Sequence, residues 1–216
     1  QPIVPRTEGG DKKGIFSFTT LDDAKKLDMV INKGSRAVVI GGGLIGMSLT
    51  QALVKRGVKV SVIELKAHVL NTILDVRASI LVEEKLQAAG VKLIMGHTVA
   101  RILGKSGDVE GVELDNGEKI DCEILVFAIG VSPRLELVKG TDIAINRGIL
   151  IDRNLKTSHA GVYACGDMAE GYDFLLKINR LLPIWPAAYI GGRTAGFNMA
   201  GQNTEYDGAT VMKALN

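Results

Sequence analysis

Four glycines within the six residues GGGLIG, at positions 41 to 46, have the spacing of a phosphate-binding turn. Gly41, Gly43 and Gly46 fit the pattern G-x-G-x-x-G. In such a motif the first glycine allows a tight turn out of a strand, and the second lets a pyrophosphate approach the backbone. The third removes a side chain where helix meets sheet. The following helix N-terminus offers free N–H groups and a positive dipole end. The turn also contains Gly42, Leu44 and Ile45.

An acidic residue stands where such a motif needs one. Glu64 follows Gly46 by 18 residues and ends the apolar run VKVSVIE, so it is placed to accept hydrogen bonds from adenosine ribose hydroxyls. Leu65, the next residue in the sequence, is assigned to the same site. A carboxylate repels a 2′-phosphate, which favours NAD over NADP, although Lys66 and His68 could tolerate a phosphate if they are not simply solvated. FAD-binding units use the same glycines and acid, so the motif alone does not separate NAD from FAD.

The pattern around these residues predicts the elements that position them. Residues 37–40 are a short β-branched run, 44–54 form an apolar helix that Lys55 and Arg56 close, and 58–64 form a second strand. Residues 37–54 carry no charge, which is long enough for a membrane span, but the four glycines and the polar residues in it argue against one. The prediction is a βαβ unit that binds a dinucleotide, and the alternative is the same unit without a ligand.

Composition narrows the possible partners. The chain has 216 residues, with 26 Lys and Arg against 24 Asp and Glu, and the net charge of +2 gives no electrostatic reason to expect nucleic acid or a membrane surface. Cys122 and Cys165 are far apart, which indicates neither a disulfide framework nor a dithiol centre. A reducing, cytoplasmic location is the expectation. We assign no metal ligand.

Further along, the pattern continues a doubly wound sheet. A helix ending at Gly90 is expected to bury an apolar face made of Leu74, Ala78, Leu81, Val82 and Leu86. Residues 91–95 form the next strand, and Asn116-Gly117 indicates a hairpin. The run 124–129 is a buried strand that ends at Gly130. Ile129 and Gly130 would offer backbone to a bound nucleotide, or Gly130 is an ordinary glycine after a strand.

Four stretches occur in the order seen in a known family: AVVIGGGLIG with Glu64, LVFAIGVSPR, GILIDRNLKTSHAGVYACGDMAE and PIWPAAYIGGRTAGFNMAG. Together they resemble the FAD-dependent pyridine nucleotide-disulfide oxidoreductases. The similarity is greatest to the branch of NADH oxidases, coenzyme A disulfide reductases, rubredoxin reductases and the flavoprotein part of nitrite reductases. The resemblance implies an α/β flavoprotein with two dinucleotide-binding domains, in which a Rossmann-like, three-layer NAD-binding domain is inserted in a FAD-binding domain.

By position in that family, GGGLIG resembles the second fingerprint, which takes NAD(P)H rather than FAD. Thr20 and Asp23 have the spacing of a capping box for the small helix before the inserted domain. The expected boundaries are 1–33 for a connecting segment of the FAD-binding domain, 34–147 for the NAD(P)-binding domain and 148–216 for the C-terminal part of the FAD-binding domain. Many relatives have a glutamate where this chain has Ser48, which bears on nicotinamide positioning.

The resemblance also implies residues for FAD. Gly166 and Asp167 match a motif at the end of a strand, here 162–165, whose aspartate binds the ribityl or pyrophosphate region; Asp167 could equally cap a helix. Pro186 and Ala187 begin a stretch of small residues resembling the helix whose N-terminus faces the isoalloxazine ring, or a closely packed helix. We expect Cys165 to be a buried small hydrophobe rather than a redox thiol.

The chain is expected to be an internal fragment. The first glycine fingerprint of the family would precede Gln1, and a C-terminal domain that builds a homodimer would follow. The whole protein would pass hydride from NADH to FAD and on to an unidentified acceptor: oxygen, a disulfide or a small electron carrier. No catalytic residue is assigned, and the isolated fragment is expected to be inactive. Two alternatives remain, a NAD-binding module without turnover and a redox-regulated interaction protein resembling apoptosis-inducing factor.

Overall fold

The computed structural model describes residues 1–105 and 107–211. The chain forms two compact units, Gln1–Ser132 and Pro133–Asn216. Residues 1–33 lie in the first unit and residues 133–147 lie in the second. Strand pairing joins part of the N-terminal segment to the first unit: β1 (Ile15–Ser17) pairs in parallel with β8 (Ile124–Phe127), which adds it to the sheet of that unit. The expected domain boundaries stay a prediction.

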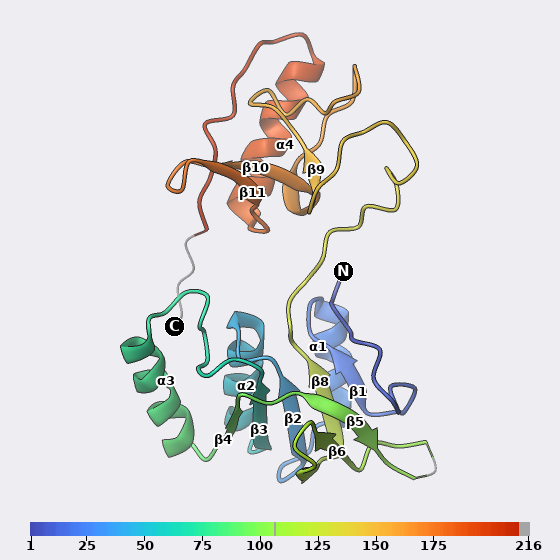
Figure 1. The fold of residues 1–216 in the computed structure, drawn as a ribbon, viewed down its shortest axis with the longest axis vertical. Helices are drawn as coiled ribbons and strands as arrows, with labels where there is room; N and C mark the ends of the chain where they lie inside the picture. Colours follow the sequence, from blue (N-terminus) through green and yellow to red (C-terminus); the bar gives the residue numbers. More distant parts are fainter. Residues whose placement is uncertain (106, 212–216) are drawn as a thin grey trace. The chain divides into compact units, whose positions relative to one another are not determined.

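The first unit is built on a parallel sheet of five strands in the order β1-β8-β2-β3-β4 (Figure 1). Its remaining strands are β2 (Arg36–Ile40), β3 (Lys59–Glu64) and β4 (Lys92–Met95). The described residues of this unit form three helices: α1 (Leu21–Val30), α2 (Leu44–Lys55) and α3 (Val76–Ala88). The βαβ unit expected from the sequence is therefore present as β2, α2 and β3.

Alternation along the buried strands produces three layers. Val39 of β2 packs in one core with Met47 and Leu53 of α2, and residues of α1 and α3 join the same core. The neighbouring Val38 points to a second core, which includes Val112. That core is covered by an antiparallel sheet of β5 (Val99–Leu103), β6 (Gly111–Leu114) and β7 (Lys119–Asp121). The hairpin expected at Asn116-Gly117 joins β6 to β7.

Two helix predictions can be compared in detail. The capping box is confirmed, because the Thr20 hydroxyl accepts from the Asp23 N–H while the Asp23 carboxylate accepts from the Thr20 N–H. The prediction of the buried apolar face of α3 is partly wrong, because Leu81 is 63% exposed whereas Ser79 is only 1% exposed. Ser79 is tolerated in the interior because its hydroxyl donates to the Val69 carbonyl at 2.8 Å.

In the second unit, residues 133–211 form a small mixed sheet and one long helix. Its elements are β9 (Ile149–Leu150), η1 (Gly166–Met168), β10 (Ala169–Asp173), β11 (Ile178–Leu181) and α4 (Trp185–Met199). Strand β10 pairs in parallel with β9 and antiparallel with β11. The strand expected at 162–165 is not formed, because among the described residues only Tyr163 makes a bridge there, to Lys156. Cys165 is exposed, which corrects its expected burial.

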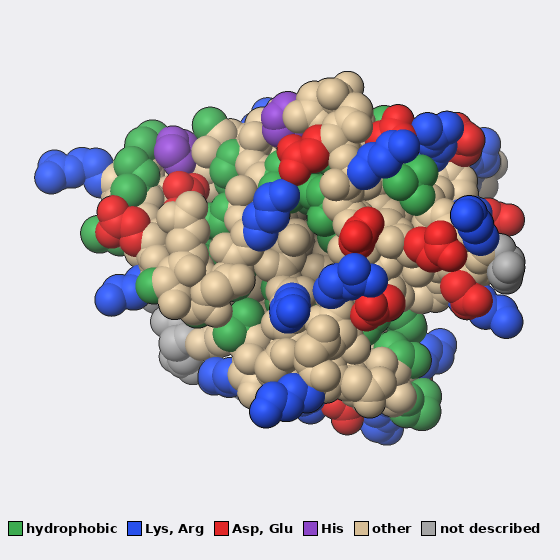
Figure 2. Space-filling model, turned by 90° about the horizontal axis from the view of Figure 1, so that it is seen from below, with side chains coloured by type: hydrophobic (Ala, Val, Ile, Leu, Met, Phe, Trp, Pro, Cys, Tyr) green, Lys and Arg blue, Asp and Glu red, His purple; other side chains and the backbone are tan. Residues whose placement is uncertain are grey.

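On the face shown in Figure 2, basic and acidic side chains are interspersed rather than gathered by sign. The described part of the chain has exposed ion pairs, such as Arg36 with Glu123 at 2.9 Å and Lys92 with Glu118 at 3.0 Å. None of the helices in the described part of the chain combines the length and the hydropathy of a membrane-spanning segment.

Candidate functional site

The glycine turn after β2 has no room for a side chain at two of its glycines but has room at a third. Gly41 has φ of +110°, and a Cβ there would lie 2.6 Å from the Ala128 carbonyl oxygen, so a side chain is excluded. A Cβ on Gly46 would collide with the Gly41 carbonyl oxygen. By contrast, no neighbouring atom of the described residues lies within 4 Å of a Cβ built on Gly43. The turn is therefore compact beneath the helix and leaves free space at Gly43.

The helix that follows presents an uncapped N-terminus to that space. Gly43 is the N-cap of α2 and provides no side-chain hydrogen bond, and the first turn holds no acidic residue. The N–H groups of a helix's first turn have no intrahelical partner, and here they include those of Leu44 and Ile45. Free N–H groups, a positive dipole end and an open approach at Gly43 fit the binding of a pyrophosphate.

Glu64 ends β3 directly beside this turn. Its Oε2 accepts the Gly42 N–H at 2.6 Å, and its Oε1 accepts the Lys66 N–H at 2.8 Å. An ionised carboxylate has about four lone-pair sites, so these two bonds leave acceptor capacity for other donors such as hydroxyl groups. The structure thus brings together the glycine motif and the acid that the sequence separates by 18 residues.

The other residues expected around a nucleotide lie at the same edge of the sheet. A Cβ on Gly41 would be 3.2 Å from the Ile129 Cα, so Ile129 lies against the turn. The carbonyl of Gly130 already accepts the Ile3 N–H at 3.0 Å. Leu65 is 60% exposed next to Glu64. Contact of these three residues with a nucleotide stays a prediction.

Sequence reasoning missed a second support of the turn. The N–H of Leu70, in the loop between β3 and α3, donates to the Gly42 carbonyl at 2.8 Å. Leu70 is buried and adopts φ of +53°, a conformation uncommon for a leucine. The sequence does not indicate this conformation, because position 70 is a leucine. A glycine or an asparagine there would have suggested a left-handed backbone.

In the second unit, the residues expected to bind FAD come from two adjacent elements. Gly166, with φ of +74°, opens η1, and Asp167 lies inside that short helix. Asp167 is therefore not its N-cap, which is Cys165. Pro186 stands in the first turn of α4, whose N-cap Ile184 provides no side-chain hydrogen bond.

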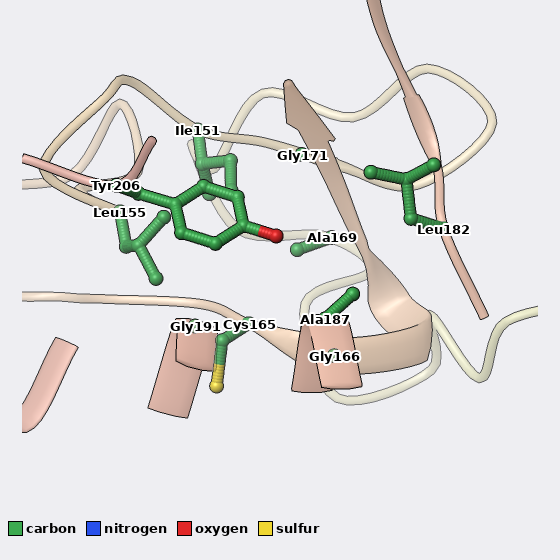
Figure 3. Close-up of a pocket in the computed structure, with 10 residues that line it drawn as sticks. All are labelled: Ile151, Leu155, Cys165, Gly166, Ala169, Gly171, Leu182, Ala187, Gly191 and Tyr206. Carbon is green, nitrogen blue, oxygen red and sulfur yellow. The ribbon is translucent and has the colours of Figure 1, made fainter. Parts of the chain in front are cut away.

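Gly166 and Ala187 line one small pocket (Figure 3). The other lining residues are Ile151, Leu155, Cys165, Ala169, Gly171, Leu182, Gly191 and Tyr206. The Tyr206 hydroxyl points toward Ala169 in this view. The structure thus brings together η1 and the N-terminal half of α4. The contact of these residues with FAD stays a prediction.

Neither thiol is set up as a reactive thiolate. Burial raises the pKa of Cys122 to about 12, and partial desolvation raises the pKa of Cys165. His68 and His97 each contact a carboxylate, that of Glu83 at 3.2 Å and that of Asp115 at 2.8 Å. Among the described residues no cluster of three or more potential ligands is placed to hold a metal ion.

Comparisons with known proteins bear on the family and the fold of this chain. The family model described as pyridine nucleotide-disulphide oxidoreductase matches residues 1–204. A NADH oxidase of Methanocaldococcus jannaschii is 32% identical over 95% of this chain and 46% of its own length. The chain spans about half the length of this curated relative.

Two solved structures extend the likeness. A FAD-dependent pyridine nucleotide-disulphide oxidoreductase from Desulfovibrio vulgaris has a TM-score of 0.84 at 27% identity, covering 95% of this chain and 53% of that one. The water-forming NADH oxidase from Lactobacillus brevis, solved with NADH bound, has a TM-score of 0.89 at 25% identity. That match covers 96% of this chain and 46% of the oxidase.

Proposed function

Because the chain belongs to the pyridine nucleotide-disulphide oxidoreductase family, we propose that its first unit binds NADH and that its second unit contributes to a FAD site. The whole protein is then an NADH-dependent flavoprotein oxidoreductase that passes electrons to a second acceptor. When bound, NADH and FAD supply the hydride transfer, and the residues of this chain hold and orient them. The acceptor is oxygen, a disulfide or a small electron carrier.

One observation carries the proposal: the Glu64 carboxylate contacts Gly42 inside the glycine turn, at the open N-terminus of α2. This arrangement provides N–H donors for a pyrophosphate and an acceptor for the adenosine ribose within one small region. The negative charge of Glu64 disfavours a 2′-phosphate, so the proposed substrate is NADH rather than NADPH. The M. jannaschii and L. brevis relatives, both named as NADH oxidases, support the same substrate.

The FAD part of the proposal rests on the second unit. The α4 N-terminus lacks a side-chain cap and lies beside Gly166 of η1, so its dipole is available to stabilise negative charge on a flavin. The D. vulgaris relative is named as FAD-dependent, which supports this cofactor. On the family resemblance, the proposal extends to a homodimeric, cytoplasmic whole protein, within which the boundaries 1–33, 34–147 and 148–216 separate the nucleotide domains.

The experiment is a titration of this chain with NADH and with NADPH, followed by the fluorescence of the reduced nicotinamide. Replacing Glu64 with alanine (Glu64→Ala) removes an acceptor for ribose hydroxyls. A hydrogen bond to a charged group contributes about 1.5–3 kcal/mol, so NADH affinity should fall roughly 10- to 150-fold. NADPH affinity should fall less than NADH affinity, because the loss of the bond from the Gly42 N–H to Glu64 affects both nucleotides, whereas the loss of a repulsive charge favours only the one with a 2′-phosphate.

Glu84→Ala, which removes an exposed carboxylate of the same unit, is the matched control and should leave both affinities unchanged. Equal losses of NADH and NADPH affinity in Glu64→Ala would contradict the ribose assignment. The absorption spectrum of the purified chain tests the second unit separately. A colourless preparation that binds NADH would favour the alternative of a NAD-binding module without turnover in this chain.

A further inference from the structure

Both backbone polar groups of Gly42 are hydrogen-bonded. Its N–H donates to Glu64 and its carbonyl accepts the N–H of Leu70, at 2.6 and 2.8 Å respectively. Glu64 is the last residue of β3, while Leu70 belongs to the loop of residues 65–75 that leads from β3 to α3, here called the crossover loop. The shape of the glycine turn therefore depends on where the crossover loop lies.

Leu70 does not adopt its conformation unaided. A left-handed backbone is unfavourable for a leucine, and it persists only where the surroundings hold it. The loop closes on itself there, because the Leu70 carbonyl accepts the N–H groups of Ile73 and Leu74 at 2.9 and 3.0 Å. Leu70 also packs in the core shared with α2.

The residue before Leu70 is fixed by α3. The Val69 N–H donates to Oε1 of Glu83 at 3.0 Å, and the Val69 carbonyl accepts the Ser79 hydroxyl at 2.8 Å. Val69 and Ser79 are buried, and the Glu83 side chain is 16% exposed. The same Oε1 lies 3.2 Å from Nδ1 of His68. Two side chains of one helix thus clamp the backbone next to Leu70.

We propose that Glu83 and Ser79 are positioning residues for the NADH site, acting through Val69 and Leu70 on the carbonyl of Gly42. The inference rests on the proposed function of the first unit. Without the Glu83 acceptor, the Val69 N–H is buried and unpaired, and the crossover loop can satisfy it only by opening. An opened loop releases Gly42, so only a fraction of the molecules would have the glycine turn in its binding conformation. The apparent Kd for NADH then rises in inverse proportion to that fraction.

The test compares four variants of this chain. Glu83→Leu removes the acceptor, Ser79→Ala removes the second clamp, and Glu83→Gln keeps an acceptor oxygen without the charge. Glu84→Leu makes the same substitution at the exposed neighbouring position and is the control. NADH affinity is measured by titration, and amide hydrogen exchange is measured without nucleotide for the crossover loop and for β2 and β3.

We expect the NADH Kd to rise about tenfold in Glu83→Leu and about threefold in Ser79→Ala, as a binding-competent population of roughly one tenth or one third would give. Glu83→Gln should restore the affinity to within about threefold, and Glu84→Leu should match the unsubstituted chain. The Leu70 amide should exchange faster in Glu83→Leu while the amides of β2 and β3 keep their protection.

The outcomes separate the two proposals. If the unsubstituted chain fails to bind NADH, the proposed function falls and the positioning role falls with it. If that chain binds NADH and Glu83→Leu binds it equally well, only the positioning role is refuted. Faster exchange throughout the first unit would also refute it, because the effect would then be global unfolding. Should Glu83→Leu fail to fold, Ser79→Ala decides by the same two measurements.

Discussion

Replacing Gly43 with alanine should separate nucleotide binding from folding. Gly43 has φ of −81° and ψ of −173°, a conformation that alanine adopts without strain. Within the part of the chain that the structure describes, no neighbouring atom lies within 4 Å of the Cβ that the substitution would add. The structure of the first unit should therefore accept Gly43→Ala, whereas the new methyl group would occupy the space proposed for the pyrophosphate.

The two expected effects differ in size. Alanine lowers the entropy of the unfolded chain, worth about 0.4–1 kcal/mol, but it is a poorer N-cap than glycine by a similar amount. The free energy of unfolding should change by less than about 1 kcal/mol, and the thermal midpoint by less than about 4 °C. A methyl group that displaces the pyrophosphate from the α2 N-terminus removes at least one charge-assisted hydrogen bond of about 1.5–3 kcal/mol. The NADH Kd should rise roughly 10- to 150-fold.

Thermal melting followed by circular dichroism and titration with NADH measure these effects on the same samples. Gly196→Ala is the matched control, because Gly196 lies exposed in α4 with nothing within 4 Å of an added Cβ. It should raise the stability of the second unit slightly and leave NADH affinity unchanged. If folded Gly43→Ala binds NADH as tightly as the unsubstituted chain, the pyrophosphate does not approach Gly43 and the reasoning is refuted.

Two further predictions concern stability. Thr50 is buried in α2, and within the described residues its hydroxyl has no hydrogen-bond partner. Thr50→Val should therefore stabilise the first unit by about 1 kcal/mol. An unchanged or lower thermal midpoint would contradict this prediction. In the second unit, burial by itself raises the pKa of Asp173, but hydrogen bonds from the Leu176 N–H, from Arg180 and from Thr210 outweigh it and hold that pKa below its ordinary value. A lowered folded-state pKa means that this contribution is present above the unfolded pKa, near 3.9, and is lost as the pH falls through the folded value. Asp173→Asn should therefore lower the thermal midpoint at neutral pH, with a deficit that narrows below about pH 4; a deficit independent of pH would contradict the assignment.

The first unit was largely predictable because its signals are local. The uncharged strand, the glycine turn and the apolar helix lie within residues 37–54, and the structure forms β2 and α2 there. The capping box of α1 involves only Thr20 and Asp23, three residues apart. Such features depend on residue types within a few positions of one another, so a sequence records them directly.

Predictions that depended on distant partners succeeded less well. Residues 162–165 have the composition of a strand, but a strand exists only where a neighbour pairs with it, and Tyr163 makes only an isolated bridge. On α3, spacing predicted that Leu81 would be buried, whereas Ser79 takes the interior position because the Val69 carbonyl is there to accept its hydroxyl. In both cases the deciding partner cannot be identified from the local sequence.

The glycine turn shows why a motif can be found without its supports. A G-x-G-x-x-G pattern records where side chains are excluded, as the carbonyl oxygens of Ala128 and Gly41 exclude them at positions 41 and 46. The groups that hydrogen-bond to Gly42 are harder to identify from the sequence. Glu64 is recognisable because a carboxylate is needed at that place, but the second support is the backbone N–H of Leu70, which any residue except proline could supply. Glu83 and Ser79, the side chains proposed to position this N–H through Val69, can therefore be identified only from the tertiary structure. Substitutions at these two positions should show whether the glycine turn needs their support to bind the nucleotide.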